Sequence, residues 1–351
     1  MDIYIPSDVN KYINKKHLFI LVRPFYSKEG WVINDKQLQD WGIDSSNIRL
    51  VLNLDRADLM LLPYFINYYI CNGLYHKLKE YNSCCIKNNI KAFGFVAGDY
   101  GEQFPEFDNI IYFRMGGFRS QLSERNIGLP AALSDHNFRL FGSNNINLRK
   151  KNKKLVIGFC GQSDSSQIKR SKDSIMYIFE NIKRFISNPD RSDYETIFSS
   201  AYHRYQILNN LECSKLVYTN FIHRKKYRAG AISEYDMHKT TLEYYNNIRE
   251  SDYILCLRGG GNYSIRFYET LLMGRIPVFI NTDCILPLMD KINWKEHVVW
   301  IEWEERHQIA EIVAKFHNDI SSDDFRQIQL SNRKLWLEKL QPAYILTHCL
   351  Q

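Results

Sequence analysis

The sequence predicts an α/β protein built from two doubly wound units, each with a parallel sheet between layers of helices. Strand-like apolar runs alternate with helical segments in both halves of the chain, which is the pattern of such folds. Three consecutive glycines separate a strand-like run from a helical one in the C-terminal half. The 351 residues are enough for two separate cores.

The first unit is expected over residues 1–148. Short apolar runs predict its strands at 18–22, 59–62, 92–97 and 110–113, while 37–41 and 66–81 are expected to be helical or irregular. The third run is followed by Gly98-Asp-Tyr-Gly-Glu102. This sequence predicts a loop at the carboxyl end of a strand.

The second unit is expected over residues 149–330. A strand is predicted at 155–160, and helices are predicted at 174–185 and 240–249, each followed by a strand-like run. Residues 331–351 are expected to form a separate C-terminal segment with an amphipathic helix at 333–340.

The most informative stretch is 253–281, which predicts a strand at 253–257, a glycine loop, a helix and a further strand at 276–280. Gly259, Gly260 and Gly261 carry no Cβ, so a ligand can approach the backbone closely. Asn262 or Ser264 can cap the helix, and a glycine at 274 suits its C-terminal end. A right-handed crossover then makes the two strands parallel and places a phosphate site at the helix N-terminus.

Charged residues make this site more specific. Arg258 enters the loop, Arg266 lies in the first helical turn, and Glu269 shares the helix face of Arg266. A cation for phosphate and a carboxylate for sugar hydroxyls describe a nucleotide-sugar site. The alternative is an exposed ion pair worth roughly 0.2–0.5 kcal/mol; the adjacent glycines favour the site.

Two other functions are compatible with this stretch. Gly259-x-Gly261-x-x-Ser264 approaches a dinucleotide fingerprint, and Asp283 follows at about the expected 20 residues. The third glycine is missing, however, and Arg266 would crowd a pyrophosphate held by backbone. An NAD-dependent oxidoreductase therefore ranks second, and a non-catalytic nucleotide- or glycan-binding protein ranks third.

The segment from Arg258 to Glu269, followed by Gly274-Arg-Ile-Pro-Val278, resembles the signature of exostosin-like glycosyltransferases. Downstream, 286–287 and 292–294 also resemble the family's pattern. Weaker similarities occur upstream, in the family's order, at 57–63, 93–101, 128–130 and 159–161. The resemblance implies a GT-B fold of two Rossmann-like domains facing a central cleft, with the C-terminal helix packed back on the first. It also implies a nucleotide-sugar donor, expected to be UDP-linked, inversion at the anomeric carbon, and no cofactor or obligatory metal.

Within that resemblance, Arg258 and Arg266 are expected to stabilise the departing nucleoside diphosphate. Glu269 is assigned to ribose or sugar hydroxyls. The phosphate is expected to meet main-chain N–H groups or hydroxyls of the loop, which comprises Gly259, Gly260, Gly261, Asn262, Tyr263 and Ser264.

Inversion also needs a general base for the acceptor hydroxyl. Asp99 and Glu102 are the main candidates, although Asp99 suits an Asx turn equally well. His17 and His203 are weaker candidates. Arg114 and Arg119 are expected either to hold an acidic acceptor group or to solvate a turn.

The net charge of +7 arises partly from basic clusters at 149–154 and 224–228. The first is expected to be a solvated linker, or else a contact with an anionic membrane that displays a lipid-linked glycan acceptor. The second is expected near donor phosphates or an acidic acceptor. No nucleic-acid motif accompanies the charge, so nucleic acid is not an expected partner.

The eight cysteines include no Cys-x-x-Cys, which argues against a zinc site or a disulfide framework. No signal peptide and no apolar run of about 20 residues is found. Animal exostosins are anchored in the Golgi, so the sequence predicts a cytoplasmic, bacterial relative, peripheral to the membrane, that contributes to a cell-surface polysaccharide such as a capsule or O-antigen.

Overall fold

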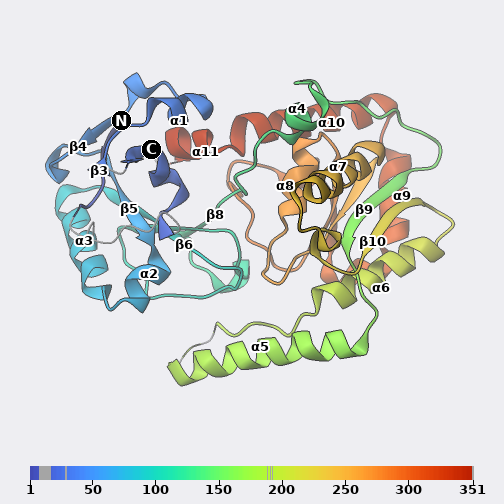
Figure 1. Cartoon of the computed structure of the whole chain (residues 1–351), viewed down its shortest axis with the longest axis horizontal. Helices are drawn as coiled ribbons and strands as arrows, with labels where there is room; N and C mark the ends of the chain where they lie inside the picture. The colour runs from blue at the N-terminus through green and yellow to red at the C-terminus, as the bar shows by residue number, and fades with distance from the viewer. Residues whose placement is uncertain (8–16, 28–29, 188, 190, 192, 350–351) are drawn as a thin grey trace. The chain divides into compact units, whose positions relative to one another are not determined.

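The computed structural model describes residues 1–7, 17–27, 30–187, 189, 191 and 193–349 (Figure 1). The chain forms two compact units. The first contains 1–132, 285–288 and 339–351, and the second contains 133–284 and 289–338. The boundary therefore lies at Ala132 rather than at residue 148, and the segment that returns to the first unit starts at Lys339 rather than at residue 331.

The first unit contains a six-stranded parallel sheet with the strand order β4-β1-β5-β6-β7-β8. The strands are β1 (Asp2–Tyr4), β4 (Arg49–Val51), β5 (Leu59–Phe65), β6 (Lys91–Val96), β7 (Ile110–Arg114) and β8 (Asn126–Gly128). A short antiparallel pair, β2 (Tyr26–Ser27) and β3 (Gly30–Trp31), stands apart from this sheet. The strands predicted at 59–62, 92–97 and 110–113 are confirmed.

Apolar side chains on both faces of this sheet are buried. Leu59 and Leu61 of β5 belong to one core cluster, whereas Met60, Leu62 and Tyr64 belong to another. The helices α2 (Ile66–Cys71) and α3 (Tyr75–Asn88) contribute to the second cluster. Helix α1 (Asp35–Asp40) contributes Leu38 to the first. Because helices and buried side chains cover both faces of this sheet, the unit is doubly wound.

The strand predicted at 18–22 is wrong. Residues Ile20–Phe25 form the 3-10 helix η3, which contains Pro24. Leu21 and Val22 are fully buried, so the run is apolar because it belongs to the core. A short apolar run does not by itself distinguish a strand from a buried helical turn, and proline lacks the N–H that a central strand needs.

The C-terminal segment completes the core of the first unit. Helix α11 (Pro342–Tyr344) is followed by a π-helical turn at Ile345–Cys349. Ile345 and Leu346 are fully buried in the same cluster as Ile3 and Phe113. The residues that return to the first unit thus follow the predicted helix at 333–340, which is the end of α10 (Ser322–Lys339).

The second unit contains a five-stranded parallel sheet with the order β10-β9-β11-β12-β13. The strands are β9 (Val156–Gln162), β10 (Tyr218–Arg224), β11 (Tyr253–Cys256), β12 (Ile276–Asn281) and β13 (Val299–Glu302). The strands predicted at 155–160, 253–257 and 276–280 are confirmed. The chain leaves β9 toward β10 on one side and leaves β11 toward β12 on the other, so the switch point lies between β9 and β11.

Helices precede, connect and follow these strands. They are α4 (His136–Phe141), α5 (Gln167–Ser187), α6 (Ser200–Cys213), α7 (Glu234–Glu250), α8 (Ile265–Leu272) and α9 (Ile309–Asp319). Helix α6 contacts β10, α7 contacts β9, α8 contacts β12, and α9 contacts β13. The helices predicted at 174–185 and 240–249 are confirmed within α5 and α7. None of the helices in the described part of the chain is long and apolar enough to span a bilayer.

The basic cluster at 149–154 is part of the second unit rather than a linker between two units. The Arg149 side chain donates from Nε to the carboxylate of Asp252, which is fully buried, at 2.8 Å. The side chain of Gln329 accepts a hydrogen bond from the Arg149 backbone N–H. This arginine therefore fixes the entry into β9, while Lys150, Lys153 and Lys154 are exposed.

Candidate functional site

The glycine loop lies at the switch point of the second sheet, directly after β11. Neither Gly259 nor Gly260 has a positive φ, so the backbone does not require glycine there. A Cβ on Gly260 would meet no atom within 4 Å, and one on Gly259 would meet only the Tyr263 carbonyl oxygen at 3.8 Å. The space beside these residues is open, which is where a ligand can contact the backbone.

Asn262 fixes the loop to the end of β12. Its side chain is buried and donates to the carbonyls of Thr282 (2.8 Å) and Asp283 (3.0 Å). Its Oδ1 accepts from the Thr282 hydroxyl at 2.7 Å and from the Cys284 thiol at 3.2 Å. The Asn262 side chain therefore holds the loop, so it does not cap α8, whose N-cap position is occupied by Ser264 without a side-chain bond.

Arg266 joins α8 to the end of β9. Its Nη2 donates to the Cys160 carbonyl at 2.9 Å, and its guanidinium lies 4.2 Å from the centroid of the Phe159 ring. Gly161 makes room for it, because a Cβ there would lie 2.6 Å from Nη2. The buried Nε has no hydrogen-bond partner among the described residues. Arg266 is thus held at the switch point with donor capacity left.

Arg258 supports the loop from inside the unit. Its Nη2 donates to the Gly260 carbonyl at 3.1 Å and lies 3.7 Å from the carboxylate of Glu195. Its guanidinium lies 4.7 Å from the ring centroid of Phe198. The side chain is almost fully buried, and burial lowers its pKa. Its positive charge therefore acts on the loop from the interior of the unit.

A third arginine, Arg204 of α6, was not anticipated from the sequence. It donates from Nη1 to the Gln162 carbonyl (3.1 Å) and from Nη2 to the Arg258 carbonyl (3.2 Å), which links the ends of β9 and β11. Burial, reinforced by the like charge of Arg266, lowers its pKa to about 10, so it stays cationic at neutral pH. No local motif marks this arginine within its helix, so only the fold places it at the site.

Glu269 binds two tyrosines of α7 instead of pairing with Arg266. Its carboxylate accepts hydrogen bonds from the hydroxyls of Tyr244 (2.5 Å) and Tyr245 (3.0 Å). Burial raises its pKa, although these bonds and Arg266 oppose the rise. The Tyr244 ring centroid also lies 5.8 Å from the Arg266 guanidinium, so α7 and α8 share one polar cluster beside the loop.

The loop that carries Asp99 and Glu102 follows β6 in the first unit. Asn67 donates to the carboxylate of Glu102 at 3.3 Å and also hydrogen-bonds the backbone of Ala97. The Asp99 side chain is exposed, whereas Glu102 is half-buried. Both carboxylates lie after the carboxyl end of a parallel strand, the edge at which such sheets bind ligands.

The remaining predicted candidates have structural partners. Arg114 is buried and donates to the carbonyls of Glu102 (2.6 Å) and Gly116 (2.8 Å). Arg119 donates to the backbone carbonyl of Leu122, three residues further along the chain, at 2.9 Å. His17 packs near the rings of Phe65 and Tyr68, and His203 near those of Phe198 and Trp303. Arg114 therefore fixes a turn rather than facing an acidic acceptor.

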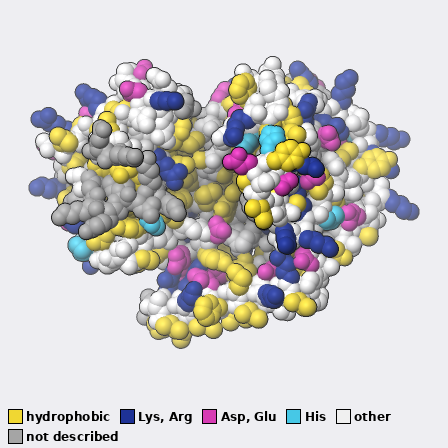
Figure 2. Space-filling view, viewed as in Figure 1, with side chains coloured by type: hydrophobic (Ala, Val, Ile, Leu, Met, Phe, Trp, Pro, Cys, Tyr) yellow, Lys and Arg dark blue, Asp and Glu magenta, His cyan; other side chains and the backbone are white. Residues whose placement is uncertain are grey.

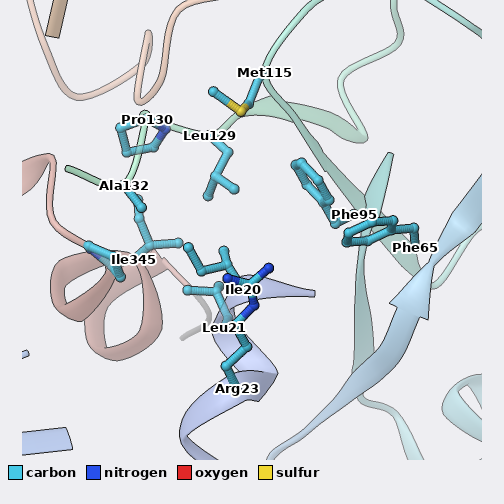
Figure 3. Close-up of a pocket in the computed structure, with 11 residues that line it drawn as sticks. Ile20, Leu21, Arg23, Phe65, Phe95, Met115, Leu129, Pro130, Ala132 and Ile345 are labelled. Atoms are coloured by element: carbon cyan, nitrogen blue, oxygen red, sulfur yellow. The ribbon is translucent and has the colours of Figure 1, made fainter. Parts of the chain in front are cut away.

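A cavity of about 170 Å³ opens at the same edge of the first sheet (Figure 3). Phe65 and Phe95 come from strands β5 and β6, and Leu129 follows β8. Ile345 of the C-terminal segment lines another side. Among the lining residues only Arg23 is charged, so the cavity suits an apolar group next to an anionic one.

Comparison with known proteins identifies the family. Residues 134–316, just over half of the chain, match the family model described as the exostosin GT47 domain. A rice protein named "Probable glucuronosyltransferase Os01g0926700" is 32% identical over 77 residues, which are 22% of this chain and 18% of that protein. Exostosin-1 of Drosophila melanogaster is 34% identical over 80 residues, which are 23% of this chain and 10% of that protein.

These matches span less than a fifth of the length of the two relatives. A crystal structure of TarM from S. aureus aligns with a TM-score of 0.36 and 10% identity over 82% of this chain and 53% of that one. The family match covers the glycine loop together with Arg204, Arg258 and Arg266. The chain therefore belongs to the exostosin-like family of glycosyltransferases.

Proposed function

We propose that this protein is an inverting glycosyltransferase that moves a sugar from a nucleotide-sugar donor, with UDP as the expected nucleotide, to a glycan acceptor, and that it requires no metal. One observation carries the proposal. Three arginines, Arg204, Arg258 and Arg266, surround an open glycine loop at the switch point of a parallel sheet. This arrangement suits a diphosphate.

In the proposed reaction the bond between the anomeric carbon and the donor phosphate breaks, and its electron pair leaves on the phosphate oxygen. Arg266 and the N-terminal N–H groups of α8 stabilise that charge, while the half-buried Arg204 and the buried Arg258 add a fixed positive field. Because these groups are already positioned by backbone carbonyls, little reorganisation accompanies charge development.

The acceptor hydroxyl forms the new bond from the opposite face of the sugar, which inverts the anomeric centre. Its proton passes to a carboxylate of the first unit, Asp99 or Glu102. Asp99 is exposed and Glu102 is half-buried, and both remain candidates for this base. Glu269 and its two tyrosines supply hydroxyl-binding groups beside the loop.

The acceptor proposed for the first unit is a lipid-linked glycan. The apolar cavity beside Phe65 and Phe95 suits a hydrocarbon portion, and Arg23 suits the phosphate that links lipid to sugar. Such an acceptor belongs to the synthesis of a cell-surface polysaccharide, such as a capsule or O-antigen, by a cytoplasmic enzyme at the membrane. The cavity supports this acceptor class over a free acidic sugar.

The test is a thermal-shift screen of the purified protein in EDTA with UDP, GDP, CMP and NAD. A ligand at 100 times its Kd adds about 2.7 kcal/mol to the free energy of unfolding. One nucleoside diphosphate should raise the midpoint, and Arg266→Ala should abolish the effect, whereas Arg326→Ala, on the exposed side of α10, should retain it. Stabilisation by NAD alone would contradict the proposal and favour the oxidoreductase.

A further inference from the structure

Helix α5 presents its apolar face to solvent. Six large apolar side chains between 48% and 75% exposed lie on this face: Ile168, Ile175, Phe179, Ile182, Phe185 and Ile186. Helix α5 lies at the bottom of the view in Figure 1, away from the helices packed around the second sheet, and hydrophobic side chains line the same border in the space-filling view (Figure 2). This is the reverse of an ordinary surface helix, which buries its apolar face.

The opposite, polar face of α5 packs against the rest of the second unit. Tyr177 donates to the carbonyl of Gly260 at 2.7 Å, and Asn181 exchanges hydrogen bonds with the backbone of Glu195 at 2.9 and 2.8 Å. Ser199 donates to the carboxylate of Asp173 at 2.6 Å, and the buried Arg184 donates to the Asp193 carbonyl. These directional contacts fix the orientation of the helix, so the fold itself holds the apolar face toward solvent.

The width and the borders of the exposed face indicate what covers it. At 100° per residue, the side chains from Phe185 round to Phe179 occupy roughly 120° of the helix circumference. A seam for one partner helix is narrower, with apolar residues at two positions in seven. Exposed cations border the face at Lys172 and Lys183, and Lys183 Nζ lies 4.9 Å from the ring centroid of Phe179.

The helix as a whole carries five basic residues and two acidic ones. Basic side chains beside a wide apolar face suit a membrane surface, because their stems extend along the hydrocarbon while their charges reach anionic headgroups. The length and polarity of α5 fit a helix that lies in the interface, and no described helix has the apolar length for a span.

We propose that α5 is the element by which this protein docks on the surface of an anionic lipid bilayer, with Phe179 and Ile182 at the centre of the inserted face. Docking needs neither donor nor acceptor. The proposal therefore stands or falls separately from the glycosyltransferase function, although it deepens that function by supplying the surface on which a lipid-linked acceptor is found.

The test is cosedimentation of the full chain with vesicles of phosphatidylcholine and phosphatidylglycerol. The wild-type protein should bind, and Phe179→Ser with Ile182→Ser should lower the partition coefficient at least about tenfold, because two large apolar groups no longer leave water. Leu52→Ser, which alters a 95% exposed leucine of the first unit, is the matched control and should bind like the wild type. Thermal melts establish that each variant is folded.

A second variant separates charge from insertion. Lys172→Gln with Lys183→Gln should remove most of the preference for anionic over pure phosphatidylcholine vesicles, and added salt should do the same to the wild type. Equal vesicle binding by the wild type and the Phe179/Ile182 variant would overturn the proposal. A wild-type protein that ignores vesicles but self-associates, and becomes monomeric in that variant, would show instead that a second copy covers α5.

Discussion

Gly260 has neither a backbone nor a packing reason to be glycine, because its φ is not positive and a Cβ there would touch nothing within 4 Å. Gly260→Ala should therefore leave the melting temperature unchanged while filling the space proposed for the donor. We expect donor affinity to fall about tenfold or more. Titration calorimetry with UDP and a thermal melt of the same sample measure both quantities. A variant that loses stability but keeps its affinity would place the ligand elsewhere.

Gly161 gives the complementary prediction. A Cβ at this position would lie 2.6 Å from Nη2 of Arg266, so Gly161→Ala must displace the end of that side chain. Since the displaced group is flexible, the fold should persist while turnover falls by roughly 10²-fold or more, the cost of losing an oriented electrostatic donor. Initial rates with saturating donor measure the effect. Turnover equal to that of the wild type would remove Arg266 from the mechanism.

Glu269 makes stability depend on pH. Burial raises its pKa in the folded protein above its usual value near 4.5, so the folded state holds the proton more tightly than the unfolded chain does. The higher pKa of Glu269 stabilises the folded state fully below about pH 4.5, and this stabilisation is lost as the pH rises through the pKa of the folded protein. Glu269→Gln should therefore gain in melting temperature relative to the wild type as the pH rises above 4.5. A difference that is constant across this range would contradict the shift.

Residue types and spacing were sufficient to find the loop, Arg258, Arg266 and Glu269, because these positions lie within one local motif. They did not show that Arg258 is internal, or that Arg204 completes the set. Those facts depend on which strand ends meet across the sheet, and strand order is not contained in any local pattern. The identity of Glu269's partners likewise required the packing of α7 beside α8.

At the scale of elements, the connection from β11 through the loop and α8 to β12 depends on one buried amide. Asn262→Ala would remove its hydrogen bonds to the end of β12 and leave the Thr282 and Asp283 carbonyls without this donor. We expect a loss of roughly 2–4 kcal/mol in the free energy of unfolding. Urea denaturation measures it, with the exposed Asn152→Ala as control. A loss within 0.5 kcal/mol or so, as for an ordinary surface position, would contradict this role.

The sequence predicted most elements because β5, β6, β9, β11 and β12 are apolar on both faces, as central parallel strands are. It failed at 18–22, where an apolar run becomes the 3-10 helix η3 around Pro24. It also placed α5 at 174–185 without recognising which face the helix would bury. That choice is made by tertiary hydrogen bonds at Tyr177 and Asn181, which periodicity cannot reveal.

At the scale of the molecule, each unit has its own core, and the C-terminal segment belongs to that of the first. Ile345→Ala would empty a fully buried site and should cost about 2–5 kcal/mol. The loop proposed to bind the donor lies in the second unit, so UDP should stabilise that unit directly. Calorimetry of the variant, with and without UDP, measures both effects. A substitution that leaves the unfolding profile unchanged would mean that the segment does not stabilise the first unit.

The unit boundaries were the least predictable feature. The sequence placed the division in the basic run 149–154, whose composition is typical of a solvated linker. In the structure Arg149 binds the buried carboxylate of Asp252, and the chain passes from the first unit to the second after Ala132. A long-range ion pair thus ties the start of this apparent linker to the second unit. No composition window can distinguish the two cases.

The outward apolar face of α5 should also make the protein surface-active. In a lipid-free solution the same exposed apolar side chains should adsorb to other interfaces with water, including air, plastic and chromatography resin. In thin films prepared for electron microscopy, particles should therefore adsorb with α5 toward the air and share one dominant orientation. A small amount of detergent should cover the apolar face and restore random particle orientations. It should also reduce the amount of protein lost by adsorption to chromatography columns.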